Sequence, residues 1–493
     1  MSPKLKNPIE KQFSTLTPYH YYFFFLLFCS KLPIFWHTLS LIFVSPSMNY
    51  VCNDMLLEGQ WKQNACPCKD PEWNRSVFTE TFQTKFGIVC DKTWLTSFSQ
   101  SMLYVGTLVG SLVFGFLSDI HGRLSMFSLG CLILAVSGCL VSIMPTITTF
   151  ILMRCIEGIG VGGAVVTSFV LCVEYCGTKH REIITALFHI PINLSHVTLA
   201  GISYLLRNCD HFQLALSLPI FFFVMLKWLV LESPKWLMDV GKTDEAAAVM
   251  EKISRFNRNP SESIKPELEE YQASRANSSR TKMKFWQIFR HRRLSLNLVC
   301  MAVIYFVCGM GYYGVSQFIG LMIGNIHLNV AMSGALLLPG TIAAIFLLKI
   351  LNRRQFLMAT NFLSGLCMLV AVFLTDTWPR VIIACICNCF FFLSFIIAFL
   401  YSVELFPTSV RNSVLGILSV LARTGQITAP LINDLSQTVS GCIFAVMAIL
   451  ATVMCYPLPE TKNTELPSTL EDSKTLPRQK IRPGSDVQDD EVG

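Results

Sequence analysis

The chain has 493 residues, of which 52% are hydrophobic and 14% are charged. About 25% of the residues of a typical soluble protein are charged, so this composition excludes an ordinary soluble fold and indicates a chain surrounded by lipid. The net charge of +7 does not by itself indicate a nucleic-acid partner, because basic residues in membrane proteins mark the side on which loops lie. We expect the lipid bilayer as a partner and no nucleic acid.

A helix that crosses a bilayer needs about 20 mostly apolar residues, and the sequence predicts twelve such spans. In chain order they cover residues 20–45, 97–117, 125–144, 147–172, 183–206, 213–231, 294–316, 328–350, 355–374, 380–402, 413–434 and 438–457. Lys31, Pro33 and His37 interrupt the first span. A signal peptide is the alternative there, and it is disfavoured because the stretch is long and has no small-residue cleavage site.

The polar segment between the sixth and seventh spans, residues 232–293, ends in a run with seven Lys/Arg and no acid. Loops rich in Lys/Arg stay on the cytosolic side, so this central loop is predicted to be cytosolic. An even number of spans then places residues 1–19 and the polar tail 459–493 in the cytosol as well. The composition of the tail predicts disorder.

By the same parity, residues 46–96 form a loop outside the cell. This loop contains Asn74-Arg75-Ser76, an acceptor sequence for glycosylation of Asn74. Its four cysteines are Cys52, Cys66, Cys68 and Cys90. The oxidising exterior favours two disulfides, and three pairings are possible. The spacing of Cys and His residues indicates no metal site, and we expect no cofactor.

Charged residues after the second, fourth, eighth and tenth spans recur with a constant offset of 230 residues. They are Arg123, Glu174 and Arg181 in the first half and Arg353, Glu404 and Arg411 in the second. The constant offset indicates a duplicated unit of six spans. The sequence therefore predicts an all-α membrane protein with one six-helix bundle at 20–231 and another at 294–458.

Two parallel six-helix units are the layout of carriers that rock their halves around a central site. A carrier must keep one gate shut while the other opens, and charge pairs that form in only one state supply that bias. We therefore predict that Glu174, Arg181, Glu404 and Arg411 form a cytosolic gate. The alternative is that they are ordinary interface charges that fix the topology.

Several motifs then resemble known families. GFLSDIHGR (115–123) resembles the loop signature of the major facilitator superfamily, and Arg154 to Gly162 resembles its fourth-helix motif. VCDKTWLTSFSQS (89–101), YYGVS (312–316) and ELFPTSVRN (404–412) are similar to the organic cation, anion and carnitine transporters of solute carrier family 22. The similarity runs from about residue 86 to 462. It implies the twelve-helix fold of the superfamily and a plasma-membrane carrier that works as a monomer on small organic ions.

The resemblance adds Asp119 and Arg123 to the predicted cytosolic gate, and Arg353 is the counterpart of Arg123 in the second half. It also directs attention to Arg154, which costs about 2.5–3.5 kcal/mol in the middle of a span and should therefore face the interior and have a partner. Glu157 lies three residues further on and shares nearly the same helix face. A structural ion pair and a role in transport are both open for these two residues.

The substrate prediction depends on Arg423, the ionisable residue of the eleventh span. The resemblance implies that cation carriers have an aspartate at this place, whereas anion and carnitine carriers have an arginine. A guanidinium in a low dielectric attracts a carboxylate or sulfonate, so we predict an anionic or zwitterionic substrate, with a counter-ion or exchanged anion as a further partner. The alternative is that a protein carboxylate neutralises Arg423.

Aromatic residues in the seventh and tenth spans are predicted to stack on flat parts of the substrate, and nearby hydroxyl and amide groups to hydrogen-bond with it. These candidates are Tyr312, Tyr313, Gln317, Phe391, Phe392 and Phe395. Leu337 stands where the resemblance implies a carboxylate, and its apolar side chain further disfavours a cation carrier.

The sequence is less consistent with other functions. An organic cation or carnitine carrier is the main alternative, followed by a receptor or scaffold that kept the fold without transporting. A sugar carrier is disfavoured because a hexose has no use for the charge of Arg423. An enzyme is disfavoured because the histidines have no catalytic or metal-ligand spacing. A primary pump is disfavoured because the sequence has no ATP-binding loop of the G-x-x-x-x-G-K-[ST] type.

Overall fold

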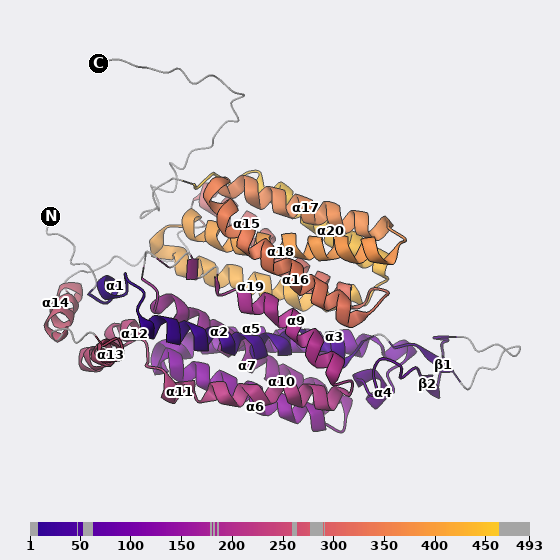
Figure 1. Cartoon of the computed structure of the whole chain (residues 1–493). Helices are drawn as coiled ribbons and strands as arrows, with labels where there is room; N and C mark the ends of the chain where they lie inside the picture. The colour runs from indigo at the N-terminus through magenta and orange to yellow at the C-terminus, as the bar shows by residue number, and fades with distance from the viewer. Residues whose placement is uncertain are drawn as a thin grey trace, which may run out of the picture.

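The computed structural model describes residues 8–46, 48–52, 63–177, 180, 183–184, 187–258, 264–276, 289 and 291–462. Its long helices run roughly parallel in an elongated bundle, with the first half of the chain on one side and the second half on the other (Figure 1). The short helices α1 (Pro8–Gln12), α12 (Pro234–Asp239), α13 (Thr243–Phe256) and α14 (Lys265–Ala276) lie at one end, which we call the terminal end. The opposite end carries β1, β2 and α4, and we call it the disulfide end.

Between the two ends, the described part of the first half contains six long helices and two short ones. They are α2 (Pro18–Leu39), α3 (Leu41–Val44), α5 (Trp94–His121), α6 (Arg123–Ile143), α7 (Ile147–Glu174), α9 (Ile190–Leu205), α10 (Cys209–Val224) and α11 (Leu226–Leu229). The second half contains α15 (Arg292–Gly320), α16 (Ile326–Ile350), α17 (Arg353–Phe373), α18 (Thr377–Leu405), α19 (Thr408–Asn433) and α20 (Gln437–Cys455).

Within the described ranges, 11 helices are long and apolar enough to cross a membrane. They match eleven of the twelve predicted spans. The predicted span 183–206 corresponds to α9, which has 16 residues and follows a segment that is only partly described.

Helices α5 and α7 approach each other through glycines on both sides of their contact. A Cβ added to Gly158 of α7 would lie 2.0 Å from the carbonyl oxygen of Leu103, and one added to Gly162 would lie 2.2 Å from that of Thr107. From the other side, a Cβ on Gly106 of α5 would lie 2.0 Å from a backbone oxygen of α7. Small residues thus allow two backbones to touch, as is common between helices in membranes.

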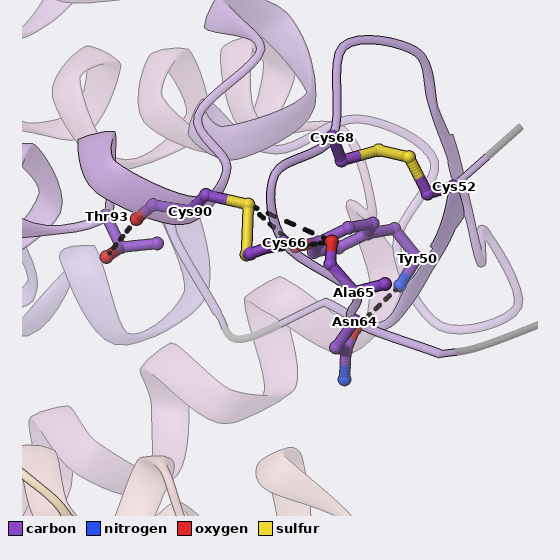
Figure 2. Close-up of a disulfide and its surroundings, with 8 residues drawn as sticks. All are labelled: Tyr50, Cys52, Asn64, Ala65, Cys66, Cys68, Cys90 and Thr93. Carbon is purple, nitrogen blue, oxygen red and sulfur yellow. Dashed lines mark hydrogen bonds between the residues drawn. A yellow bond between two sulfur atoms is a disulfide. The ribbon is translucent and has the colours of Figure 1, made fainter. Parts of the chain in front are cut away.

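The disulfide end is a small folded unit. The strands β1 (Tyr50–Cys52) and β2 (Pro71–Trp73) pair antiparallel, and α4 (Phe82–Phe86) and the 3₁₀ turn η1 (Cys90–Lys92) lead into α5. Figure 2 shows the two disulfides, Cys52–Cys68 and Cys66–Cys90, which select one of the three pairings left open by the sequence. The side chain of Asn74 is exposed, as glycosylation requires.

This unit is attached to the first half. Lys85 of α4 binds both carboxylate oxygens of Asp210 on α10 at 2.8 Å and donates to the carbonyl of Ser142 on α6 at 3.0 Å. The Phe82 ring packs against Phe150 of α7 with the ring centroids 4.5 Å apart. At the terminal end, Trp236 and Met250 bury their side chains against the same half, so the described part of the central loop also belongs to the first half.

Candidate substrate site between the two halves

Two predicted tyrosines of α15 face the first half. The ring of Tyr313 lies 5.6 Å from that of Tyr104 on α5, and the ring of Tyr312 lies 6.2 Å from that of His196 on α9, measured between centroids. The two tyrosine rings are 4.9 Å apart in an edge-to-face contact. These contacts place Tyr312 and Tyr313 at the interface between the halves. Sequence reasoning missed Tyr104 and His196, because nothing in their spans shows which helix face meets the other half.

Arg423 of α19 lies at the same interface and is half-buried. Its guanidinium donates to Oε1 of Gln426 at 3.3 Å, and Tyr313 is close enough to interact with its charge. Within the described residues, no carboxylate oxygen lies within 4.0 Å of Arg423. The positive charge is therefore not neutralised by any carboxylate of the described chain.

Lys31 of α2 is a second cation near this site. Only 1% of its side chain is exposed, and its ammonium nitrogen lies 3.8 Å from the centroid of the Phe188 ring. Arg423 is among the few groups whose charge acts on Lys31. In the sequence, Lys31 interrupts the first predicted span, and a lysine 13 residues inside an apolar helix is itself a signal of function.

Aromatic rings connect the surroundings of the two cations. The Phe188 ring, which lies beside Lys31, is 6.5 Å from the His189 ring, measured between centroids. The His189 ring is 5.8 Å from the ring of Phe392 on α18, and the Phe392 ring is 5.1 Å from that of Tyr312. Tyr313 completes this series beside Arg423. We call these five rings the aromatic arc. A cation at each end and flat rings between them suit a planar organic molecule with acidic groups.

In the part of the chain that the structure describes, four buried polar atoms without a hydrogen-bond partner belong to the arc or to residues beside it. They are the Tyr312 hydroxyl, Nδ1 of His189, Nε2 of His196 and Nε2 of Gln426. Most buried polar atoms in proteins are satisfied. These four are available to a polar ligand, and other buried polar atoms of the described chain also lack a partner.

The other predicted substrate residues lie apart from the arc. Phe391 is fully buried, and its ring covers Gly311 of α15, so its contacts are within the second half. Phe395 is half-buried with its ring 6.3 Å from that of Tyr305, also in the second half. Gln317 accepts a hydrogen bond from Asn433 at 3.4 Å, near the disulfide end of α15. The structure therefore brings together Tyr312, Tyr313 and Arg423.

Arg154 and Glu157 form an ion pair at 3.1 Å, and both side chains are fully buried. Arg154 also donates to Ser40 and to Gln100 of α5, each at 3.0 Å. Glu157 accepts from Gln213 of α10 at 3.0 Å and contacts Nδ1 of His37 on α2. This network joins α2, α5, α7 and α10 inside the first half. All of these contacts lie within the first half.

The predicted gate charges form two equivalent clusters at the terminal end. Arg123 pairs with Glu174 at 3.1 Å and with Asp119, and Arg353 pairs with Glu404 at 3.3 Å. Each cluster lies within its own half. Arg411 donates to the carbonyl of Phe406 at 3.2 Å, and Arg181 lies outside the described residues.

Each cluster includes an acid that sequence reasoning did not use. Glu232 accepts the backbone N–H of Leu124 at 3.0 Å, and Glu460 accepts that of Arg353 at 2.8 Å. Both carboxylates thus sit at a helix N-terminus, of α6 and α17, where a negative charge is favourable. The signal was available in the sequence, because similar segments follow the sixth and twelfth spans, LESPKWL (231–237) and LPETKN (458–463), and each contains one of these acids.

Known proteins share this architecture and sequence. The profile described as "Sugar (and other) transporter" matches residues 28–471. Organic anion transporter 3 of Oryctolagus cuniculus is 30% identical over 82% of this chain and 76% of its own length. Solute carrier family 22 member 3 of Rattus norvegicus is 28% identical over 83% of this chain and 74% of its own length. The chain belongs to solute carrier family 22 of the major facilitator superfamily. This membership makes it a multi-pass membrane transporter.

The fold of this family member also matches solved transporters. The inward-open xylose transporter XylE from E. coli superimposes with a TM-score of 0.67 over 92% of this chain and 99% of its own, at 15% identity. In the solute carrier described here, the halves meet by hydrogen bonds near the disulfide end. Ser101 donates to the carbonyl of Ile427 at 3.0 Å, and Ser203 lies 3.3 Å from Nε2 of His327. The gate clusters at the terminal end, in contrast, do not cross between the halves.

Proposed function

We propose that this solute carrier moves small organic anions across the plasma membrane by alternating access, with both termini in the cytosol and one chain as the transport unit. The observation that carries the proposal is Arg423, a guanidinium at the interface of the halves for which the described chain supplies no carboxylate. Charged groups in spans are costly and usually paired, so an unpaired one at a central interface is best explained by an anion that arrives as the ligand.

Electrostatics favours an anion over a cation at this place. Two unit charges 4 Å apart interact by about 4 kcal/mol at an effective dielectric constant of 20. The charge of Arg423 would oppose a quaternary ammonium ion by an energy of this order and favour a carboxylate by the same amount. The name of the rabbit relative, organic anion transporter 3, supports this assignment. A relative from Drosophila melanogaster, named organic cation transporter protein, represents the competing one.

The arc supplies the remaining requirements of an organic ligand. Its rings offer flat apolar surfaces, and the unpartnered Tyr312 hydroxyl and Gln426 amide offer hydrogen bonds. Binding between the halves also fits alternating access, because a ligand held by both halves can favour one arrangement over the other.

Uptake by cells that express the protein tests the proposal. Cells are given a labelled organic anion, carnitine or a quaternary ammonium cation, and wild type is compared with Arg423→Asp and Arg423→Lys. We expect saturable anion uptake by wild type, partial retention in Arg423→Lys and loss of at least about tenfold in Arg423→Asp, corresponding to about 1.4 kcal/mol.

Lys227→Gln is the matched control, because it removes a cation that is exposed on α11, away from the site. Surface labelling of each variant separates lost transport from lost expression. Quaternary ammonium uptake by wild type with no anion uptake would refute the charge assignment. If a panel of anions, carnitine and cations all fail to enter despite normal surface expression, the receptor alternative is favoured.

A further inference from the structure

Among the described residues of the first half, two Lys/Arg side chains are fully buried, and only one of them has a carboxylate partner. Arg154 is neutralised by Glu157 at 3.1 Å. Lys31, on α2, is 1% exposed, and among the described residues no carboxylate oxygen lies within 4.0 Å of its ammonium group. The fold thus provides a counter-ion for one buried charge and leaves the other without one.

The surroundings of Lys31 do not explain it as a structural residue. The titratable groups within electrostatic reach of Lys31 include Cys172 on α7, Cys131 on α6 and the guanidinium of Arg423 on α19. His189 is also within electrostatic reach of Lys31. None of these groups is a carboxylate, and one is a permanent cation on the opposite half. The Phe188 ring at 3.8 Å gives a cation–π contact of about 0.5–2 kcal/mol, which is less than the roughly 2.5–3.5 kcal/mol cost of a lysine at the centre of a span.

Snorkelling does not explain Lys31 either. A lysine that reaches for the membrane surface keeps its ammonium group in water. Lys31 instead buries its whole side chain under Phe188, in the interior of the molecule.

We propose that Lys31 is a second anion-binding group of the substrate site and determines its selectivity for charge. On this assignment, which rests on the proposed function, the preferred substrates are organic anions with two acidic groups. One acid lies near Arg423 of the second half and the other near Lys31 of the first, with the body of the molecule along the aromatic arc. Such a ligand neutralises both cations, whereas an anion with one acidic group leaves one of them uncompensated in a low dielectric.

A pair of matched ligands isolates the second charge. Isophthalate has two carboxylates on one flat ring, and its monomethyl ester has the same ring with one. We expect wild-type carrier to be inhibited by isophthalate at a concentration at least about tenfold lower than by the ester, measured against uptake of a labelled organic anion.

Three variants assign the preference to Lys31. The side chain of Lys31→Met has a similar length without the charge. We expect the inhibitory concentration of isophthalate to rise about tenfold in this variant, while that of the ester changes less than about twofold. Lys31→Arg keeps the charge and is expected to keep the preference. Lys227→Met, at an exposed position of α11, is the control for the removal of a lysine.

The outcomes separate this inference from the function on which it rests. If wild type transports no organic anion, the proposed function fails. If wild type transports anions but shows no preference for isophthalate, or if Lys31→Met keeps the preference, only the role of Lys31 fails. Should Lys31→Met not reach the surface, thermal stabilisation of purified wild type decides, because isophthalate must raise the melting temperature more than its ester does. Equal stabilisation by the two ligands would refute the assignment.

Discussion

Replacement of Gly158 by alanine adds one methyl group where α5 and α7 touch. The new Cβ would lie 2.0 Å from the carbonyl oxygen of Leu103, 2.9 Å from the carbonyl carbon of the same residue and 3.0 Å from the amide nitrogen of Thr107. All three are backbone atoms of a long helix, so no flexible side chain can move aside. The helices must separate by about 1 Å at this point before the closest contact becomes tolerable.

The expected cost follows from two opposed effects. Inserting a methyl group into a closely packed region typically costs about 1–3 kcal/mol. Replacing glycine by alanine within a helix gains about 0.5–1 kcal/mol from backbone entropy. Gly201→Ala on α9 is the matched control. A Cβ there meets no atom within 4 Å, so only the gain in backbone entropy remains.

Thermal unfolding in detergent, followed by the fraction that elutes as a monodisperse peak, measures the difference. The gain is common to both variants, so they differ by about 1–3 kcal/mol. We expect Gly158→Ala to unfold about 2–12 °C below Gly201→Ala, since 1 kcal/mol corresponds to about 2–4 °C in units of 150–250 residues. Equal melting temperatures for these two variants would refute the close contact between α5 and α7.

Three further predictions concern other parts of the molecule. Glu157→Gln leaves Arg154 buried without a counter-ion and should destabilise the protein by about 3–5 kcal/mol, and unfolding in detergent should show partial recovery when Arg154→Gln is added. Cys66→Ser opens a disulfide that joins residues 24 apart and should lower the stability of the disulfide end by about 3 kcal/mol, which limited proteolysis with and without reductant can detect. Asn74→Gln should abolish a glycosidase-sensitive shift on gels, whereas persistence of that shift would show that another site is modified.

The helices were predictable because span length and low charge are local properties. The sequence could not show which face of each span meets the other half, and Lys31 illustrates the consequence. Read along the chain, this lysine only weakened the first span, whereas packing shows it beside Phe188 and within reach of the charge of Arg423. The helix faces likewise decide that Phe391 covers Gly311 while Phe392 joins the arc.

Long-range pairing was the other limit. Four cysteines in a short loop cannot reveal their partners, because the choice depends on how β1, β2 and η1 fold against one another. Charge recurrence, in contrast, was informative: the offset of 230 residues places Arg123 and Arg353 in equivalent clusters, each with its glutamate. A repeat carries three-dimensional information because both copies fold in the same way.

The contacts that join the halves near the disulfide end have a thermodynamic consequence. His327 of α16 stacks on Phe43 with the ring centroids 5.4 Å apart and lies 5.4 Å from the ring of Phe78, and each ion pair between described residues stays within a single half. Opening this end therefore hydrates aromatic surface instead of separating charges. Hydration of apolar surface raises the heat capacity and is little affected by a change in ionic strength. We expect the logarithm of the reorientation rate to curve when it is plotted against reciprocal temperature. We expect the rate to be nearly independent of salt concentration.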